Sequence, residues 1–199
     1  MLNRGNVLYG DCRMIKRLIL ASQSPRRKEL LSQVGVVFTV ITAEVEETKE
    51  GTAPQIAVTN AVRKAECVAK SYPDQAVLGA DTVVCVDREV FGKPSDREEA
   101  VRMLTSLSGR WHQVYTGVAL CDGGTTKTAC CKTDVHFVQM TEAEIRNYVD
   151  TGEPFGKAGA YAIQGRAGYY IDRIEGSFSN VIGLPLTDVR EMLSGTDDE

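Results

Sequence analysis

Short apolar runs alternate with amphipathic segments along most of this chain. The apolar runs predict strands at 17–21, 38–41, 76–86, 89–91, 111–121, 127–139, 169–175 and 178–182. Apolar positions that recur every three to four residues predict helices at 24–33, 54–70, 95–107, 141–150 and 185–193. Strands and helices that alternate in this way are typical of α/β and α+β folds.

Three of the predicted helices begin with residues that favour an N-terminal cap. Ser24 directly precedes a proline and is expected to accept a hydrogen bond at the start of the first long helix. Ser95 and Glu98 have the spacing of a capping box. Thr141 and Glu144 repeat that spacing. These signals fix where the helices are expected to begin.

The composition is that of an ordinary globular protein. The 199 residues are 43% hydrophobic and 25% charged, and the formal net charge is -4. This suits one compact domain, or two small lobes that share a cleft. A weakly acidic protein has no overall positive field to hold a nucleic-acid backbone, so stable nucleic-acid binding is not expected. A small anionic ligand needs only a local basic pocket, which this charge permits.

The domain is expected to span residues 14–195. Residues 1–13 lack the apolar stretch of a secretory signal and are expected to be an extension outside the fold. Residues 196–199 form a short acidic tail. No apolar run approaches the length that a membrane span requires. The sequence therefore predicts no membrane association.

The cysteines favour a reducing compartment. None of the six forms a C-x-x-C pair, so neither a zinc site nor a redox motif is indicated. Cys67 and Cys85 lie among apolar residues and are expected to be small core residues. Free thiols persist in reducing surroundings, and a cytoplasmic location is expected.

A first candidate site follows the strand at 17–21. The segment Ser22-Gln23-Ser24-Pro25-Arg26-Arg27 joins a strand to a helix N-terminus, where unpaired N–H groups and the helix dipole attract anions. Two hydroxyls and two guanidiniums beside it would suit a polyphosphate. The alternative is a capped helix with two solvated arginines. No G-x-x-x-x-G-K-[ST] motif occurs, so this is not a Walker loop.

A second candidate is Asp81, which interrupts an apolar strand. A carboxylate buried without a partner would cost several kcal/mol, so Asp81 must be capped, paired with a cation or bound to a metal. Its functional interpretation is a general base or a metal ligand, and its alternative is a structural aspartate bonded to the backbone. Lys64 and Lys93 could supply cations nearby, although lone lysines are usually solvated. Arg27 and Lys93 are both expected to be exposed in a cleft.

Two further segments could contribute to a nucleotide site. Glu47 lies in an acidic run at 44–50 that is either a solvated loop or a source of Mg²⁺ ligands. Gln164 lies in the glycine-rich stretch 151–168, and its amide could pair with a base edge. The alternative for that stretch is a mobile surface loop. The two histidines, His112 and His136, stand apart from these segments and indicate no nucleophilic acyl chemistry.

Several motifs together resemble the Maf family of septum-formation proteins, which are also known as nucleoside triphosphate pyrophosphatases. They occur in the family's order between residues 17 and 193: L-I-L-A-S-Q-S-P-R-R-K-E-L-L, L-G-A-D-T-V-V, G-K-P, L-S-G-R-W-H-Q-V-Y-T-G-V-A-L, K-A-G-A-Y-A-I-Q-G and V-I-G-L-P-L. The resemblance implies an α/β fold with an elongated mixed sheet flanked by helices, in which two lobes surround a central cleft. One departure is Gly156, where many members carry an aspartate.

The resemblance also implies roles for particular residues. Asp81 matches the proposed proton acceptor. The phosphate-binding positions match Ser22, Arg26 and Arg27. Other charged pocket positions match Glu47, Lys64 and Lys93, and the substrate-selecting positions match Arg26, Thr82 and Gln164.

An aspartate followed by threonine resembles the branch that hydrolyses dTTP and UTP to the monophosphate and pyrophosphate, a nucleotide-pool cleansing role. The implied cofactor is Mg²⁺ or Mn²⁺, held by Glu47 and Asp81, and a homodimer is implied as well. The alternative function is a non-catalytic nucleotide sensor that regulates cell division.

Overall fold

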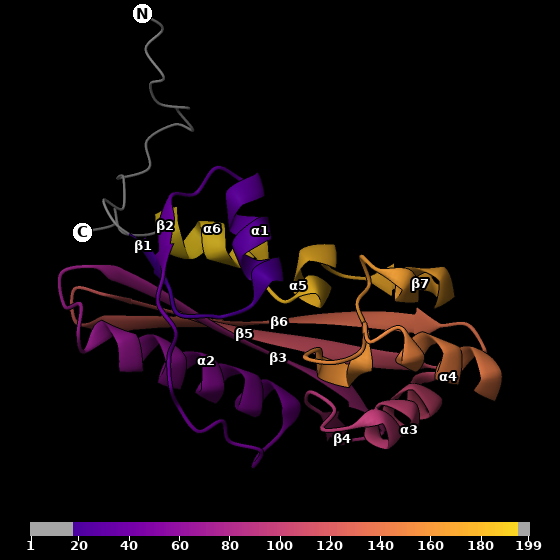
Figure 1. The fold of residues 1–199 in the computed structure, drawn as a ribbon. Helices are drawn as coiled ribbons and strands as arrows, with labels where there is room; N and C mark the ends of the chain where they lie inside the picture. The colour runs from indigo at the N-terminus through magenta and orange to yellow at the C-terminus, as the bar shows by residue number, and fades with distance from the viewer. Residues whose placement is uncertain (1–17, 195–199) are drawn as a thin grey trace, which may run out of the picture.

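Three long antiparallel strands form the spine of the molecule (Figure 1). The computed structural model describes residues 18–194, so the predicted extension at 1–13 and the tail at 196–199 lie outside the described residues. The strands are β1 (Leu18–Leu20), β2 (Phe38–Val40), β3 (Ala76–Val86), β4 (Glu89–Phe91), β5 (Trp111–Asp122), β6 (Thr125–Phe137) and β7 (Ile171–Glu175). Their order is β2-β1-β3-β5-β6-β7, with β4 paired to β3. Because β1 is parallel to both neighbours, the sheet is mixed, as predicted.

Helices cover both faces of this sheet (Figure 1). They are α1 (Pro25–Gln33), α2 (Ala53–Ala69), α3 (Arg97–Leu107), α4 (Glu142–Asp150), α5 (Phe178–Ile182) and α6 (Leu186–Ser194), with short 3-10 turns at Ala158–Ala160 and Arg166–Tyr170. Within residues 18–194, no helix is long and apolar enough to cross a membrane.

The two faces of β3 belong to different layers because successive side chains of a strand point to opposite sides. Leu78 belongs to the core beneath α1 and α6, together with Leu31 and Val189. Val77 belongs to the core beneath α2, together with Ala65. The sheet is thus enclosed by apolar layers on both faces at this end of the molecule.

Two glycines allow α2 to lie unusually close to the spine. A Cβ atom at Gly79 would be 2.3 Å from the carbonyl oxygen of Ala61, and one at Gly117 would be 2.4 Å from that of Ala57. Any larger side chain would therefore push the helix away from the sheet. This close approach brings the polar residues of α2 against the middle of β3.

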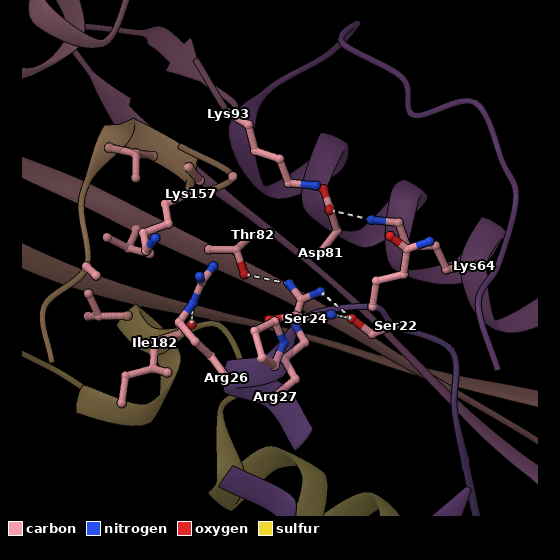
Figure 2. Close-up of a pocket in the computed structure, with 18 of the residues that line it drawn as sticks. Ser22, Ser24, Arg26, Arg27, Lys64, Asp81, Thr82, Lys93, Lys157 and Ile182 are labelled. Atoms are coloured by element: carbon pink, nitrogen blue, oxygen red, sulfur yellow. Dashed lines mark hydrogen bonds and ion pairs between the residues drawn. The ribbon is translucent and has the colours of Figure 1, made fainter. Parts of the chain in front are cut away.

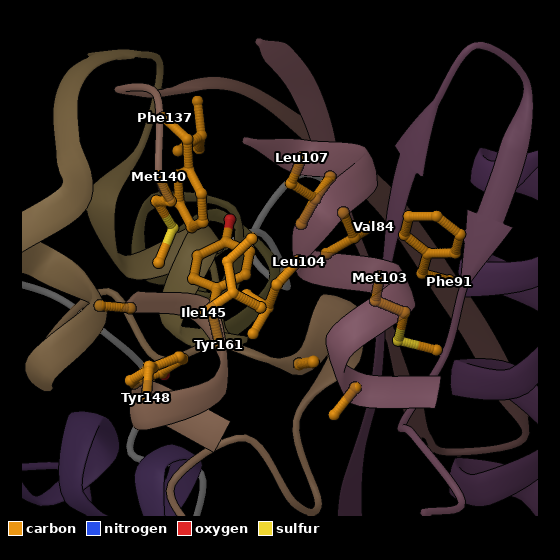
Figure 3. Close-up of a cluster of buried hydrophobic side chains, with 14 of the residues drawn as sticks. Val84, Phe91, Met103, Leu104, Leu107, Phe137, Met140, Ile145, Tyr148 and Tyr161 are labelled. Carbon is orange, nitrogen blue, oxygen red and sulfur yellow. The ribbon is translucent and has the colours of Figure 1, made fainter. Parts of the chain in front are cut away.

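The other end of the spine carries a second core. Val84, Leu104, Phe137 and Tyr161 are buried there between the strands, α3, α4 and the segment that follows α4 (Figure 3). Tyr161 packs edge-on against Phe137, with ring centroids 5.0 Å apart. This core supports the glycine-rich stretch, so that stretch is packed against the protein rather than being a free surface loop.

Several sequence-based predictions about the elements are confirmed, and one element is wrong. The strands at 76–86 and 89–91 occur with the predicted bounds, and the other predicted strands and helices up to residue 150 differ only at their ends. Residues 178–182 form α5 rather than a strand. Ser177 caps this helix by accepting from the N–H of Asn180, and Gly183 ends it with φ of 122°. The buried Asn180 amide also donates to the Val114 carbonyl, so tertiary contacts override the strand propensity.

Smaller corrections concern caps and cysteines. Ser24 is the N-cap of α1, but its side chain makes no capping hydrogen bond. The cap of α3 is Asp96, one residue later than predicted, and it accepts from the N–H of Glu99. Cys67 and Cys85 are only partly buried and are not core residues, although Cys85 packs against the buried cluster around Ala57 and Val83. The capping box at Thr141 is confirmed.

Candidate active site

One pocket contains all nine residues that the sequence singled out. It is lined by the turn after β1, the start of α1, α2, the middle of β3, the loop after β4, the segment 156–164 and α5 (Figure 2). The nine are Ser22, Arg26, Arg27, Glu47, Lys64, Asp81, Thr82, Lys93 and Gln164. The pocket has a charged end, formed by Ser22, Arg27, Glu47, Lys64 and Asp81. It also has a loop end, formed by residues 156–164 with Val84 and Val114.

Asp81 lies near the middle of β3 and is 7% exposed. Its Oδ1 accepts from Lys64 Nζ at 2.7 Å, and its Oδ2 accepts from Asn60 Nδ2 at 3.1 Å. Asn60 and Lys64 are four residues apart on α2, so they share the helix face that contacts β3. A charge and an amide therefore compensate the burial of this carboxylate. Each oxygen retains a lone pair that can face the pocket.

Lys64 also joins Asp81 to the acidic segment. Its Nζ lies 2.6 Å from Glu47 Oε1, so a single ammonium bridges the two carboxylates. Burial alone would raise the pKa of Glu47, but the hydrogen bond and charge of Lys64 outweigh it and hold that pKa below its usual value. The charge of Lys93 acts in the same direction. Glu47 is thus ionised beside Asp81, although its side chain is 42% exposed.

This pair of carboxylates fits a divalent cation shared with a substrate. Mg²⁺ in triphosphate sites takes one or two carboxylates, and phosphate and water oxygens complete its shell. Glu47 and Asp81 supply two such carboxylates in one part of the pocket, since both contact Lys64 Nζ. Among residues 18–194, no group of three or more acidic, histidine or cysteine side chains could hold a metal alone. A cation here would therefore depend on oxygens of the substrate.

Arg27 is the most firmly held cation of the pocket. Its Nε donates to the Gly183 carbonyl at 2.7 Å, and its two terminal nitrogens donate to Ser22 Oγ at 3.1 Å and Thr82 Oγ1 at 3.0 Å. The prediction that Arg27 is exposed is wrong, because these partners enclose it to 9% exposure. Burial lowers the pKa of the guanidinium, and the charge of Asp81 partly opposes that shift.

The turn before α1 has the features of an anion site. The N–H of Ser24 donates to Ser22 Oγ at 3.2 Å, which shapes the turn. No acidic residue occupies the first turn of α1, so the dipole end is not neutralised from within the helix. Arg26 is half-buried and donates from Nε to the Ile182 carbonyl at 3.4 Å. Its terminal nitrogens are directed into the pocket (Figure 2).

Lys93 differs from Arg27 in being exposed, as predicted. It extends from the loop after β4 towards the charged end (Figure 2). No hydrogen bond or ion pair holds its ammonium within the described part of the chain. Lys93 is therefore free to move towards an anion that enters the pocket.

The loop end is less polar and less charged. Val84, Val114 and Tyr161 line its floor, and Gln164 lies exposed at its rim. Lys157 also lines it and donates from Nζ to the Glu153 carbonyl. Burial, together with the nearby charge of Arg26, lowers the pKa of Lys157. An apolar floor can pack against the face of a flat heterocycle, and polar groups at the rim can form hydrogen bonds with the edge of that ring.

Sequence reasoning assigned no role of their own to Asn60, Lys157 and Thr116, which also shape the site. Thr116 Oγ1 lies 2.9 Å from Thr82 Oγ1 and donates to the Asn180 carbonyl at 3.0 Å, so it anchors Thr82 from the neighbouring strand. Asn60 could have been found from its spacing, since it precedes Lys64 by one helical turn. Thr116 carried no signal, because its role depends on strand pairing.

Comparison with known proteins agrees with this geometry. The family model described as "Maf-like protein" matches residues 17–196. The chain belongs to the Maf family. A relative from Pelotomaculum thermopropionicum, named dTTP/UTP pyrophosphatase, is 50% identical over 90% of this chain and 96% of its own. A Symbiobacterium thermophilum relative of the same name is 50% identical over 90% and 94%. A Gloeobacter violaceus relative of that name is 46% identical over 92% and 98%.

Proposed function

We propose that this protein hydrolyses nucleoside triphosphates to the monophosphate and pyrophosphate, with dTTP and UTP as preferred substrates. The observation that carries the proposal is the buried Asp81 carboxylate, which Lys64 and Asn60 hold beside a helix N-terminus flanked by arginines. The printed names of relatives that are 46 to 50% identical over most of the chain support the same activity.

The charged end suits attack of water on the α-phosphorus. A water molecule held by Asp81 would lose its proton to the carboxylate as its oxygen bonds to phosphorus. The bond between the α-phosphorus and its bridging oxygen would break, and pyrophosphate would leave with the bonding electrons. Water supplies the new oxygen on the monophosphate, Asp81 takes its proton and pyrophosphate is the leaving group, so the step needs no further reactant.

Cations around the pocket would stabilise the charge that develops on the leaving group. Arg27 is fixed in advance by three hydrogen bonds, so it needs no reorganisation as the reaction proceeds. Lys93 is free and would close on the phosphates when they bind. Such electrostatic stabilisation is the main catalytic contribution of proteins to phosphoryl transfer.

A divalent cation, Mg²⁺ or Mn²⁺, would be held by Glu47 and Asp81 together with phosphate oxygens. When bound, it would neutralise phosphate charge and orient the chain of phosphates. Lys64 contacts both carboxylates and would hold them in the same part of the pocket. The low pKa of Glu47 is consistent with a ligand that is deprotonated at neutral pH.

The loop end would select the base. Uracil and thymine present two carbonyl acceptors on either side of one N–H donor, and the amide of Gln164 can meet an acceptor and a donor together. Arg26 and Lys157 would bring further donors to the same end. Thr82 would act at the junction, because its hydroxyl is already bonded to Arg27. A wrong base edge leaves polar groups unpaired, which is how such sites discriminate.

A substrate panel tests this proposal. We expect pyrophosphate release from UTP and dTTP with a kcat/KM at least ~10-fold above that for GTP and ATP, measured with Mg²⁺ and with Mn²⁺. Preference for a purine would overturn the base assignment and leave the reaction class standing. Binding of nucleotides with no pyrophosphate from any of them would favour the nucleotide sensor instead.

The proposal also covers where the protein acts and how it assembles. Five cysteines within the described residues are free thiols, which suits the reducing cytoplasm. A homodimer remains a prediction from the family resemblance, and sedimentation of the purified chain would test it.

A further inference from the structure

Gln164 lies in a loop whose backbone is held by residues outside the pocket. The side chain is exposed at the pocket rim and makes no hydrogen bond within the described part of the chain. Its own contacts therefore do not fix its position. What fixes it must be the backbone on either side, at residues 162–163 and 165–167.

One carboxylate holds the backbone after Gln164. Glu153 Oε2 accepts from the N–H of Arg166 at 3.1 Å, and Oε1 accepts from the N–H of Ala167 at 3.4 Å. These N–H groups open the 3-10 turn at Arg166–Tyr170, where no side chain of the turn itself provides a cap. A charged acceptor at such a point is well matched to unpaired donors.

The same carboxylate holds the backbone before Gln164 through a buried phenol. The hydroxyl of Tyr148 donates to Glu153 Oε1 at 2.8 Å and accepts from the N–H of Ala162 at 3.3 Å. Tyr148 is 4% exposed and belongs to the second core (Figure 3). Burial and the hydrogen bond to Glu153 both raise the pKa of Tyr148, so the hydroxyl keeps its proton. The network thus forms hydrogen bonds with the backbone two residues before Gln164 and two residues after it.

Gly165 leaves the space that this carboxylate occupies. A Cβ atom at Gly165 would lie 2.5 Å from Glu153 Oε1 and 2.6 Å from Oε2. The φ of Gly165 is −106°, which any residue can adopt. The glycine is therefore required by the carboxylate and not by the backbone conformation. Replacing it would displace Glu153 without straining the loop directly.

We propose that Glu153 is a positioning residue for base selection, which holds the backbone on both sides of Gln164, directly and through Tyr148, and so sets where the Gln164 amide is presented. This inference rests on the proposed function. It adds that selectivity between a pyrimidine and a purine depends on a carboxylate that lies behind the loop and is not one of the pocket-lining residues.

The test is the ratio of kcat/KM for UTP to that for GTP in four variants. Glu153→Gln keeps the shape but turns an amide N–H₂ towards backbone donors, Tyr148→Phe removes the hydroxyl, and Gly165→Ala displaces the carboxylate. We expect each to lower the ratio by about fivefold. Glu175→Gln, an exposed carboxylate at the end of β7, is the matched control and should leave the ratio unchanged. General destabilisation would lower both rates alike and leave their ratio unaltered.

A double-mutant comparison identifies the route of the effect. In a Gln164→Ala background, Glu153→Gln should change the ratio by less than about twofold, because the residue that it positions is gone. A folded Glu153→Gln protein that keeps the wild-type ratio would overturn the proposal. An undiminished effect in the Gln164→Ala background would also overturn it. Should Glu153→Gln fail to fold, Gly165→Ala and Tyr148→Phe decide by the same criterion.

A binding measurement separates this proposal from the proposed function. Titration calorimetry with UMP and with GMP reports base selectivity without turnover, and the same variants should lower that selectivity in parallel. If the wild type releases no pyrophosphate from any nucleotide, the proposed function fails. The positioning role of Glu153 would then still be judged by the UMP to GMP binding ratio.

Discussion

The two ends of the pocket are held in opposite ways. At the charged end the functional side chains are fixed directly: Asp81 has two partners, and Arg27 has three. At the loop end the backbone is fixed, while the exposed Gln164 is left without a partner among the described residues. The first arrangement preorganises charge for a reaction. The second presents a free amide whose partner has to come from outside the loop.

This difference separates what each end contributes. Side chains held by direct bonds contribute to both folding and turnover, so their removal should affect both. A side chain without internal bonds contributes little to folding, so its replacement should affect turnover or selectivity and leave stability nearly unchanged. The variants below test that division, starting with the largest expected effect.

Asp81→Asn should abolish turnover and leave the fold intact. Asparagine keeps the shape and can still accept from Asn60 or Lys64, but it cannot take a proton from water. We expect kcat to fall by at least ~100-fold, as for the loss of a general base. Pyrophosphate release and thermal unfolding should be measured on the same preparation. A variant that retains most of its kcat would assign Asp81 to structure.

Arg27→Ala and Lys93→Ala should differ in stability while both weaken turnover. Arg27 is buried, and its loss removes one hydrogen bond each from Ser22, Thr82 and the Gly183 carbonyl, so we expect about 2–3 kcal/mol of destabilisation. Lys93 is exposed and should change the free energy of unfolding by less than about 0.5 kcal/mol. Urea unfolding compares them, and equal destabilisation would contradict the difference in burial.

His112 should make the loop end sensitive to acid. The ring is buried and bonded to the Tyr161 hydroxyl at 2.9 Å, and burial lowers its pKa from 6.5 to about 4. The stability due to the neutral ring is complete above pH 6.5 and is lost as the pH falls towards 4, because the unfolded chain takes the proton first. Between pH 6.5 and 5 this loss should be about 2 kcal/mol.

Urea unfolding across that pH range tests the role of His112. His112→Gln should remove the pH dependence that His112 contributes. His136→Gln should keep it, since the ring of His136 is only partly buried and is paired with Asp172 at 2.5 Å. Equal slopes in the two variants would show that the sensitivity arises elsewhere.

Asn60→Leu should have the smallest effect of these variants. It removes the donor to Asp81 Oδ2 and both hydrogen bonds to the backbone of Thr48, so the segment that carries Glu47 should loosen. We expect kcat/KM to fall by about tenfold, as for the loss of a hydrogen bond to a charged group.

A matched variant tests whether the effect of Asn60→Leu depends on where Asn60 lies or would follow from replacing any asparagine of a helix. Asn147→Leu alters an exposed asparagine on α4 and should leave kcat/KM unchanged. A kcat/KM in Asn60→Leu equal to that of Asn147→Leu would show that the amide of Asn60 does not support the site.

The sequence by itself determined the strands and helices that carry local signals. The apolar run at 76–86 predicted β3 with its bounds, and a lone carboxylate within it indicated that Asp81 must have partners. The strand-to-helix turn at Ser22 predicted an anion site, because a helix N-terminus leaves N–H groups unpaired. Burial cost and helix termini act over a few residues, so these inferences needed no knowledge of the fold.

Only the tertiary structure decided which partners those residues have. Asn60 meets Asp81 because glycines let α2 approach the sheet, and Thr116 meets Thr82 because β3 and β5 pair in one register. The enclosure of Arg27 by Gly183, and the helical form of 178–182, depend on contacts between segments more than 60 residues apart. Such contacts leave no periodic trace in the chain, because their free energy is gained only when distant segments are brought together.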